Sequence, residues 1–436
     1  MMDKKSIVFS LILTAMILVG CILNLHALIL ISVAIICLAL VLLDTRRATL
    51  ILFFFTPLSY ILVYNQYNIY VFLMVAYICG ALLRRKNAIA ILPALFVAAY
   101  CVIFSSPDVA MNLGKFISPL LLSGLLFVCY YAERQDYKYI LSYFMMGFMV
   151  SIVIGFFKNQ IPLIRNIFEV NNLVIDGTHS ILDFERFSGL SYDPNFFALI
   201  DCVLISALLF GEKKTNWLKA MALIALTVIG FFTFSKSFVI LIAVIFVLYI
   251  FTRTKAPIKI LLVALLVGGC LFCIEKFTSL KIISLISARF AYSDTVNDLT
   301  TGRASLWIEY LNYIFNDVRC FLVGEGFNAL SLEKAAHNTY IEFIYHFGLI
   351  GASAWLVYFV WCKRAIDRLG KRKASLNATA IVLMLGLFFL NSLQFQQTWC
   401  CIFIALISPY IGEDNNEEFE RNSADIQRRK IFEKVH

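Results

Sequence analysis

The sequence predicts an all-α, polytopic membrane protein. Of its 436 residues, 61% are hydrophobic and 15% are charged, whereas soluble domains hold about 45–50% apolar and about 25% charged residues. The apolar residues form long runs that match the roughly 20 residues needed to cross a bilayer as a helix, and we therefore expect about 12–14 transmembrane helices. We expect one integral membrane domain over residues 1–411.

The first apolar run, which begins at Ser6, follows Lys4 and Lys5 and lacks a small-residue cleavage site. It is soon followed by another run, so we interpret it as a retained helix rather than a signal peptide. The candidate spans lie near residues 6–24, 27–43, 48–64, 69–83, 89–106, 114–132, 138–157, 196–211, 218–234, 237–252, 258–275, 339–361, 376–393 and 396–411.

Basic residues occur in short clusters between the apolar runs, for example Arg46-Arg47, Arg84-Arg85-Lys86 and Lys371-Arg372-Lys373. If the N-terminus is cytoplasmic and the spans alternate, cytoplasmic segments hold most of the 37 Lys and Arg residues, as the positive-inside rule requires. This topology accounts for the net charge of +9, so we expect no nucleic-acid partner. Both termini are predicted to be cytoplasmic, with 412–436 as a flexible tail.

Two long loops, about 158–195 and 276–338, fall on the extracytoplasmic side of this topology. Long loops in compact proteins are usually functional or disordered, and the aromatic residues in both loops favour order. A helix is predicted from Ala304 to Phe315. Most of the 12 cysteines lie in apolar runs, where cysteine behaves as a small hydrophobe. No metal-ligand cluster stands out, so we expect neither a metal nor a cofactor.

The first long loop ends with Arg186, Asp193, Pro194 and Asn195, directly before an apolar run. Asp193 and Asn195 can accept hydrogen bonds from the free amides of a helix start, and proline suits the first turn. Capping is therefore one interpretation of this stretch. Participation in an extracytoplasmic site is the other, and Arg186 favours it.

A single cation, Lys236, lies between two closely spaced apolar runs at the outer boundary. A charge at this depth is costly without a partner or a route to the interface. The positive-inside rule does not account for it, so we interpret Lys236 as a functional cation.

The second long loop contains Gly302-Arg303, with Trp307 one turn later on the same helix face, and ends with His337-Asn338. Between them, the Gly-x-Gly at 324–326 predicts a tight turn. We do not interpret this short motif as a nucleotide-binding loop.

Together these loops can gather Arg186, Lys236 and Arg303 around His337 on one outer face. Arginine binds phosphate oxygens through its planar fork and lysine supplies a point charge. A histidine with a pKa near neutrality can accept a proton from a hydroxyl. The combination suits displacement of a phosphate-type leaving group.

Three further polar residues lie within apolar runs. Glu342 and His346 are four residues apart and share a helix face with Asn338, which predicts a buried Glu–His pair that holds helices together. Asp201 is expected either to line a cavity or to pair internally.

These residues resemble the O-antigen polymerase and O-antigen ligase superfamily of bacterial envelope enzymes. The resemblance rests on Gly302-Arg303 with Trp307, the Gly-x-Gly at 324–326, and His337-Asn338 followed by spaced glycines. "RFSGLSYDPNFFAL" is similar to the family's preceding loop. In "SKS", Lys236 stands where the family usually has arginine, which keeps the charge but loses the bidentate fork. The resemblance covers residues 186–355.

The resemblance implies a GT-C-type membrane glycosyltransferase in the bacterial cytoplasmic membrane, with its active site on the extracytoplasmic side. Its donor would be an undecaprenyl-pyrophosphate-linked oligosaccharide and its acceptor a glycan, joined with inversion and without a metal. His337 would be the general base. The remaining residues would bind substrate, the cations at the pyrophosphate and the others around it: Arg186, Lys236, Arg303, Asn338, Asp193 and Asn195.

Three functions remain open at this point. We favour a polymerase of O-antigen, capsule or exopolysaccharide, with membrane lipid, a chain-length regulator and a flippase as further partners. A ligase that transfers the glycan to lipid A core would use the same residues. A lipid-linked oligosaccharide flippase would instead place polar groups near the bilayer midplane.

Overall fold

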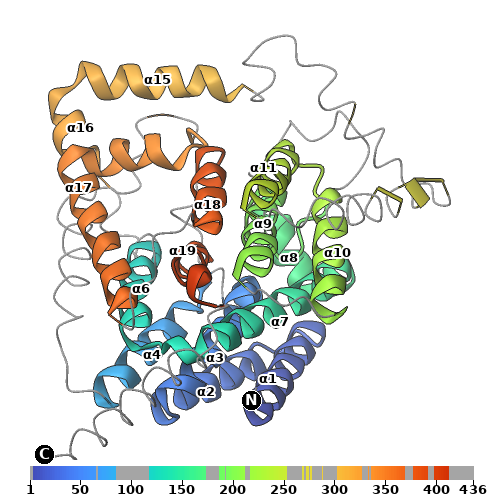
Figure 1. Ribbon diagram of the computed structural model, residues 1–436. Helices are drawn as coiled ribbons and strands as arrows, with labels where there is room; N and C mark the ends of the chain where they lie inside the picture. The colour runs from blue at the N-terminus through green and yellow to red at the C-terminus, as the bar shows by residue number, and fades with distance from the viewer. Residues whose placement is uncertain are drawn as a thin grey trace, which may run out of the picture.

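The computed structural model describes residues 3–64, 67–84, 117–172, 186–191, 193–211, 217–252, 302–326, 335–368, 377–390 and 397–411, with Leu332 and a few residues between 268 and 287. These residues form fifteen α-helices, short 3₁₀ turns and one hairpin (Figure 1). The α-helices are α1 (Lys4–Ile22), α2 (His26–Leu42), α3 (Thr45–Phe55), α4 (Val71–Arg84), α6 (Ile117–Tyr131), α7 (Tyr137–Phe156), α8 (Pro162–Asn172), α9 (Pro194–Gly211), α10 (Trp217–Phe231), α11 (Lys236–Thr252), α15 (Arg303–Asn316), α16 (Val318–Val323), α17 (Thr339–Asp367), α18 (Ala378–Phe388) and α19 (Thr398–Ile407). The short elements are η1 (Thr56–Ile61), η5 (Arg134–Asp136), η6 (Lys158–Gln160), η7 (Ser408–Tyr410), β1 (Val63–Tyr64) and β2 (Tyr67–Asn68).

Within this described part, four helices are long and apolar enough to cross a membrane: α1, α7 with its preceding turn, α9 and α17. Shorter apolar helices accompany them, among them α2, α10 and α18. This set indicates a multi-pass membrane protein, as the sequence predicts. The expected spans at 89–106 and most of 258–275, and the tail 412–436, lie outside the described residues, so the total of 12–14 stays a prediction.

The expected span at 48–64 is wrong in its second half. The α-helix α3 ends at Phe55, and the chain continues as the 3₁₀ turn η1 into the small antiparallel hairpin β1–β2. Pro57 explains the change, because proline lacks the N–H of an α-helical hydrogen bond and its ring clashes with the preceding turn. The all-α prediction therefore holds apart from this hairpin.

Large aromatic side chains fill the centre of the molecule between α3, α7 and α19. The Phe53 ring meets Trp399 with centroids 5.2 Å apart and Phe144 with centroids 6.3 Å apart. Gly147 on α7 lies against the Phe54 carbonyl so closely that a methyl group there would be 2.0 Å from the oxygen. The small residue lets α3 and α7 pack tightly.

Charged residues join the starts of α1, α3 and α7 at one end of the molecule. Arg47 Nε lies 2.8 Å from Asp3 Oδ2, and Arg46 Nε lies 2.7 Å from Asp136 Oδ1. The ends of α6 and α17 lie at the same end. There Arg368 stacks on the ring of Tyr130, with 3.7 Å to the centroid. We call this region the basic end.

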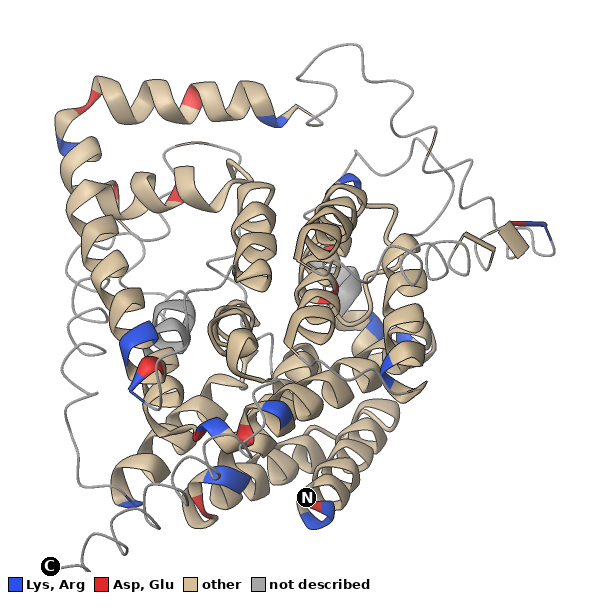
Figure 2. Ribbon diagram, viewed as in Figure 1, with Lys and Arg blue, Asp and Glu red and all other residues tan. Residues whose placement is uncertain are grey.

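Figure 2 shows that charged residues of both signs gather at helix ends, while the middles of the helices are largely uncharged. Many large apolar side chains on the outer helices are exposed, for example Val8 (55%) and Leu42 (70%). Soluble monomers rarely expose apolar surface of this extent. Lipid chains are the natural environment for it.

The starts of α9 and α17 lie at the opposite end from the basic end. Phe187, which precedes α9, stacks on Phe156 at the end of α7, with centroids 4.6 Å apart. With 20 residues, α7 is about 30 Å long at 1.5 Å per residue. The cap before α9 is thus separated from the start of α7 by about the thickness of a bilayer core.

Candidate functional site

The segment before α9 is a helix cap. Asp193 Oδ1 accepts hydrogen bonds from the backbone N–H of Asn195 (2.7 Å) and from its side-chain Nδ2 (2.8 Å). The carbonyl of Asp193 accepts from Phe196 and Phe197. The capping interpretation of Asp193 is therefore confirmed, and it leaves the second carboxylate oxygen for longer-range interactions.

Arg186 ties this cap to the turn between α10 and α11. Its Nε donates to the Thr233 carbonyl at 2.8 Å and its Nη2 to Asn195 Oδ1 at 3.2 Å. The backbone N–H of Phe187 adds a bond to the Phe232 carbonyl at 3.0 Å. Two loops distant in sequence thus form one surface.

The turn between α10 and α11 leads directly into Lys236. Phe234 has a left-handed backbone with φ 47°, after which Ser235 Oγ donates to Asn195 Oδ1 at 2.7 Å and lies 2.7 Å from Ser237 Oγ. Lys236, half-buried, begins α11 between these two serines. We call Arg186, Asp193, Asn195, Ser235 and Lys236 the α9–α11 cluster. Sequence reasoning found all its members except Ser235, whose hydroxyl beside Lys236 was the available signal.

Arg303 is the first residue of α15, behind Gly302, whose φ of 80° is in the left-handed region. Its Nη1 donates to the carbonyl of Phe389 at the end of α18. One turn later, Trp307 Nε1 donates to the Ala336 carbonyl at 2.8 Å, and its ring meets Phe388 with centroids 5.0 Å apart. These contacts hold the start of α15 beside the residue that precedes His337.

His337 has φ 51°, which is unusual for a residue other than glycine. A left-handed conformation costs roughly 1–2 kcal/mol and persists only where the surroundings enforce it. Here Trp307 binds the preceding carbonyl, and Glu342 Oε1 accepts the backbone N–H of His337 at 3.3 Å. The histidine is thereby held half-buried at the entrance of α17.

Electrostatic interactions connect His337 with both Arg303 and Asp193. Burial lowers the pKa of His337 and the nearby Arg303 cation lowers it further, while Asp193 raises it. Burial also lowers the pKa of Arg303, and Asp193 opposes that effect. Asp193 thus acts electrostatically on both His337 and Arg303, while burial and Arg303 both favour the neutral imidazole.

The side chain of Asn338 serves the helix. It is 1% exposed, and its Oδ1 accepts from the backbone N–H groups of Tyr340 (3.0 Å) and Ile341 (3.2 Å). Thr339 Oγ1 donates to the Leu390 carbonyl. Asn338 therefore fixes the start of α17 through its side-chain oxygen, and its expected role towards the histidine or the acceptor stays a prediction.

The prediction that Glu342 pairs with His346 is wrong. Glu342 bonds to the backbone of His337, and among the described residues its Oε2 has no hydrogen-bond partner. His346 Nδ1 instead donates to the Gly326 carbonyl at 3.0 Å. Both residues lie before the bend at Gly348, and each side chain instead bonds to a backbone group outside α17.

The Gly-x-Gly turn docks into that bend. The N–H of Glu325 donates to the Tyr345 carbonyl at 2.8 Å, and the N–H of Gly326 to the His346 carbonyl at 3.1 Å. These carbonyls lie in the turn before Gly348, where the kink interrupts helical hydrogen bonding. A methyl group on Gly348 would lie 2.4 Å from the Leu322 carbonyl carbon. The Gly-x-Gly turn and Gly348 thus let α16 pack against α17, a role that the sequence of either segment alone does not indicate.

Asp201 lies in α9, two turns beyond the cap, with 0% exposure. Neither of its carboxylate oxygens has a hydrogen-bond partner among the described residues. A methyl group on Gly230 would be 2.5 Å from Asp201 Oδ2. The expected internal pairing is thus not found among the described residues, and the expectation that Asp201 lines a cavity stays a prediction.

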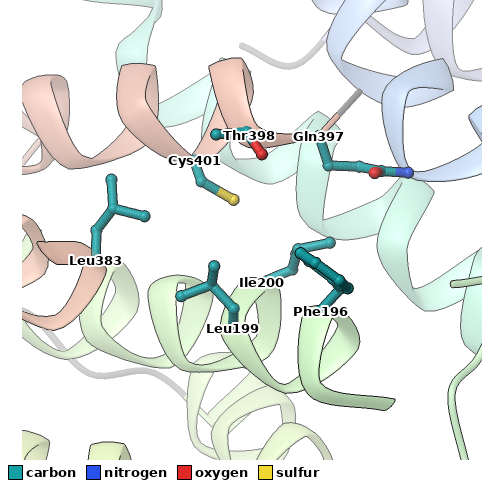
Figure 3. A pocket seen from close by; sticks show the side chains of 7 residues that line it. All are labelled: Phe196, Leu199, Ile200, Leu383, Gln397, Thr398 and Cys401. Carbon is teal, nitrogen blue, oxygen red and sulfur yellow. The ribbon is translucent and has the colours of Figure 1, made fainter. Parts of the chain in front are cut away.

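A small cavity of about 10 Å³ lies beside α9 (Figure 3). It has room for about one water molecule and is too small for a sugar. The lining comes from α9, α18, the start of α19 and Gln397 before it: Phe196, Leu199, Ile200, Leu383, Gln397, Thr398 and Cys401.

As for metals, the part of the chain that the structure describes contains no group of three or more His, Cys, Asp or Glu side chains placed to hold an ion. In comparisons with known proteins, no family model matches this chain and no curated protein sequence matches it.

Proposed function

We propose that this chain is a polysaccharide polymerase that joins polyprenyl-pyrophosphate-linked repeat units at the outer face of the cytoplasmic membrane. The observation that carries the proposal is the half-buried His337, whose pKa is lowered by burial and by the nearby Arg303 and raised by Asp193. Such a histidine is a general base beside a cation.

The proposed reaction is an inverting glycosyl transfer. A hydroxyl of the acceptor glycan gives its proton to the unprotonated ring nitrogen of His337, and its oxygen forms a bond to the anomeric carbon of the donor sugar. The bond from that carbon to the pyrophosphate oxygen breaks, and the electron pair leaves with the polyprenyl pyrophosphate. The proton leaves His337 to solvent or to the departing phosphate before the next cycle.

Cations would stabilise the charge that develops on the leaving group. Arg303 uses its Nη1 for the Phe389 carbonyl, and because a guanidinium has five N–H donors, others can reach a phosphate oxygen. Arg186 and Lys236 belong to the α9–α11 cluster that Asp193 links to Arg303. Asp193 and Asn195 would hold these cations in register.

The location of the site supports an extracytoplasmic reaction. It lies at the opposite end of α7 from the basic end, which carries Arg46, Arg47 and Arg368. Positive residues favour the cytoplasmic side. A lipid-linked donor and acceptor would therefore meet the site from the outer leaflet, after a flippase has delivered them and with a chain-length regulator acting on the product.

Two other functions give different outcomes in the same assay. A ligase would use the same base and cations but transfer the glycan to lipid A core. A flippase is favoured by one observation, the buried Asp201 in α9, because carboxylates within membrane helices often mark transport pathways. It would move the donor across a vesicle bilayer without forming a glycosidic bond.

The test uses purified full-length protein in lipid vesicles with a polyprenyl-pyrophosphate-linked repeat unit. We expect a ladder of products from the wild-type protein, which persists in a chelator, none from His337→Ala and a much weaker one from Arg303→Ala. Asn312→Ala, an exposed residue of α15, is the matched control and keeps the ladder. Folded His337→Ala protein that still polymerises would overturn the proposal.

Two further arms separate the alternatives. Product on lipid A core alone would identify the ligase. Translocation of a fluorescent donor that is lost in Asp201→Asn, without any ladder, would identify the transporter.

A further inference from the structure

Helices α15 and α16 expose a row of large apolar side chains on the surface of the molecule. Their exposed fractions are 60% for Ile308, 37% for Leu311, 66% for Phe315, 71% for Val318 and 40% for Leu322. Ile308, Leu311 and Phe315 are three and four residues apart, which is the spacing of one face of α15. Val318 and Leu322 are four residues apart on α16, which begins after the extended residue Asp317. We call these residues the apolar stripe.

The apolar stripe is not a consequence of poor attachment, because another face of α15 is well packed. Tyr310 and Ile314 are buried, at 5% and 2% exposure, and the ring of Tyr310 meets Tyr345 of α17 with centroids 5.0 Å apart. The helix is therefore fixed on α17, and the stripe is a separate, outward face.

Exposed polar residues of α15 form a third face. Ser305, Glu309, Asn312 and Asn316 are exposed, and at about 100° per residue they centre roughly 100° around the helix from Ile308, Leu311 and Phe315. A separation of exposed apolar from exposed polar residues is typical of helices that lie in the membrane interface. A helix surrounded by water has no reason to sort its exposed residues in this way.

The apolar stripe continues into the exposed apolar surface of α17. Leu322 lies at the bend, where its backbone contacts Gly348, and Leu349 and Ile350 follow directly with 48% and 56% exposure. Farther along the same candidate span, Leu356 and Val357 are 65% and 59% exposed. Figure 1 shows α15 running alongside the first half of α17 and joined to it through α16.

We propose that α15 and α16 form an interfacial element whose apolar stripe is immersed in the acyl chains of the adjacent bilayer leaflet. The continuity with the exposed surface of α17 selects lipid as the occupant, because that surface belongs to a helix able to span the membrane. The polar face of α15 then points to water or to lipid headgroups.

This placement sets the depth of the candidate site. Arg303 begins α15 and Trp307 holds that helix to the residue before His337. An interfacial α15 therefore places the side chains of Arg303 and His337 at the level of the phosphate groups of the lipids. The inference rests on exposure and helix geometry and does not depend on the proposed reaction.

Photocrosslinking of the full-length protein in nanodiscs of phosphatidylethanolamine and phosphatidylglycerol tests it. A p-benzoylphenylalanine residue replaces Phe315 or Ile308 in the stripe, and Asn312 or Asn316 on the polar face serves as the matched control. We expect lipid adducts, counted by mass spectrometry, at several-fold higher yield from the stripe positions. Each variant is first checked for the wild-type elution profile, and Leu311 substitutes for a stripe position that fails.

Equal lipid yields on the two faces would overturn the inference. So would a stripe that crosslinks mainly to a second copy of the chain or to another protein, because its occupant would then be a protein surface.

Discussion

The carboxylate of Glu342 accepts the backbone N–H of His337 at 3.3 Å, across the first turn of α17. This bond holds the backbone of His337 at φ 51°. It also gives a structural role to the buried carboxyl group of Glu342, which is 2% exposed. Glu342 is thus a positioning residue for His337, since it acts on the backbone of the proposed base.

Replacing Glu342 tests this role. In Glu342→Leu the half-buried N–H of His337 loses its acceptor, which costs up to about 1–3 kcal/mol, and we expect a lower thermal midpoint and a reduced rate of polymerisation. Glu342→Gln retains a carbonyl oxygen at the same place, so both properties should recover to near the wild-type values. If the glutamine variant is as impaired as the leucine variant, the carboxylate has a role other than accepting this bond.

Two substitutions of His337 should separate stability from activity. Alanine keeps the left-handed strain, whereas glycine removes roughly 1–2 kcal/mol of it, so His337→Gly should unfold at a higher temperature than His337→Ala. Both lack the imidazole and should give no product ladder. Identical midpoints by differential scanning fluorimetry would mean that the backbone relaxes once the side chain is gone.

The pH dependence of kcat/KM should report the electrostatics of His337. Burial lowers its pKa and Arg303 lowers it further, because a cation disfavours the imidazolium. Arg303→Gln removes that repulsion, so the pKa of His337 rises and the acidic limb of the profile moves to higher pH. Asp193→Asn removes an attraction that raises the pKa, and the limb should move to lower pH. Shifts in the same direction for both variants would contradict this assignment.

Gly348, where α16 packs against the bend in α17, should not tolerate a side chain. In Gly348→Ala the new methyl group would lie 2.4 Å from the Leu322 carbonyl carbon, at a φ of 59°. Overpacking costs about 1–3 kcal/mol and the left-handed φ adds to it, so the thermal midpoint should fall clearly. Gly268→Ala is the control, because no atom lies within 4 Å of its added methyl group. Equal midpoints for the two variants would mean that the contact between α16 and α17 is looser than its geometry indicates.

Local signals in the sequence predict the helices correctly where no tertiary contact opposes them. The helix predicted at Ala304–Phe315 is α15 (Arg303–Asn316), and the capping of α9 by Asp193 follows from its residue type. The span predicted at 339–361 is α17 (Thr339–Asp367), but its bend at Gly348 was not predicted. Hydrophobic runs do not reveal a kink that depends on a backbone contact with α16.

In the candidate site, too, local chemistry could be predicted from the sequence, whereas contacts between distant segments could not. Sequence order and topology placed Arg186, Arg303 and His337 on one face, and the structure brings Asp193 within range of both Arg303 and His337. The task of Glu342 could not be predicted, since i, i+4 spacing favours His346 as its partner. The backbone N–H that it binds becomes available only because His337 leaves the helical conformation.

By itself, the sequence determined the class of protein, the position of most helices and the residues able to bind phosphate or accept a proton. These follow from composition, apolar run length and side-chain chemistry, which act locally along the chain. Only the tertiary structure decided the left-handed backbone of His337, the bend at Gly348 and the outward apolar stripe of α15 and α16. Each depends on a contact between segments far apart in sequence, whose free energy outweighs the local preference of the chain.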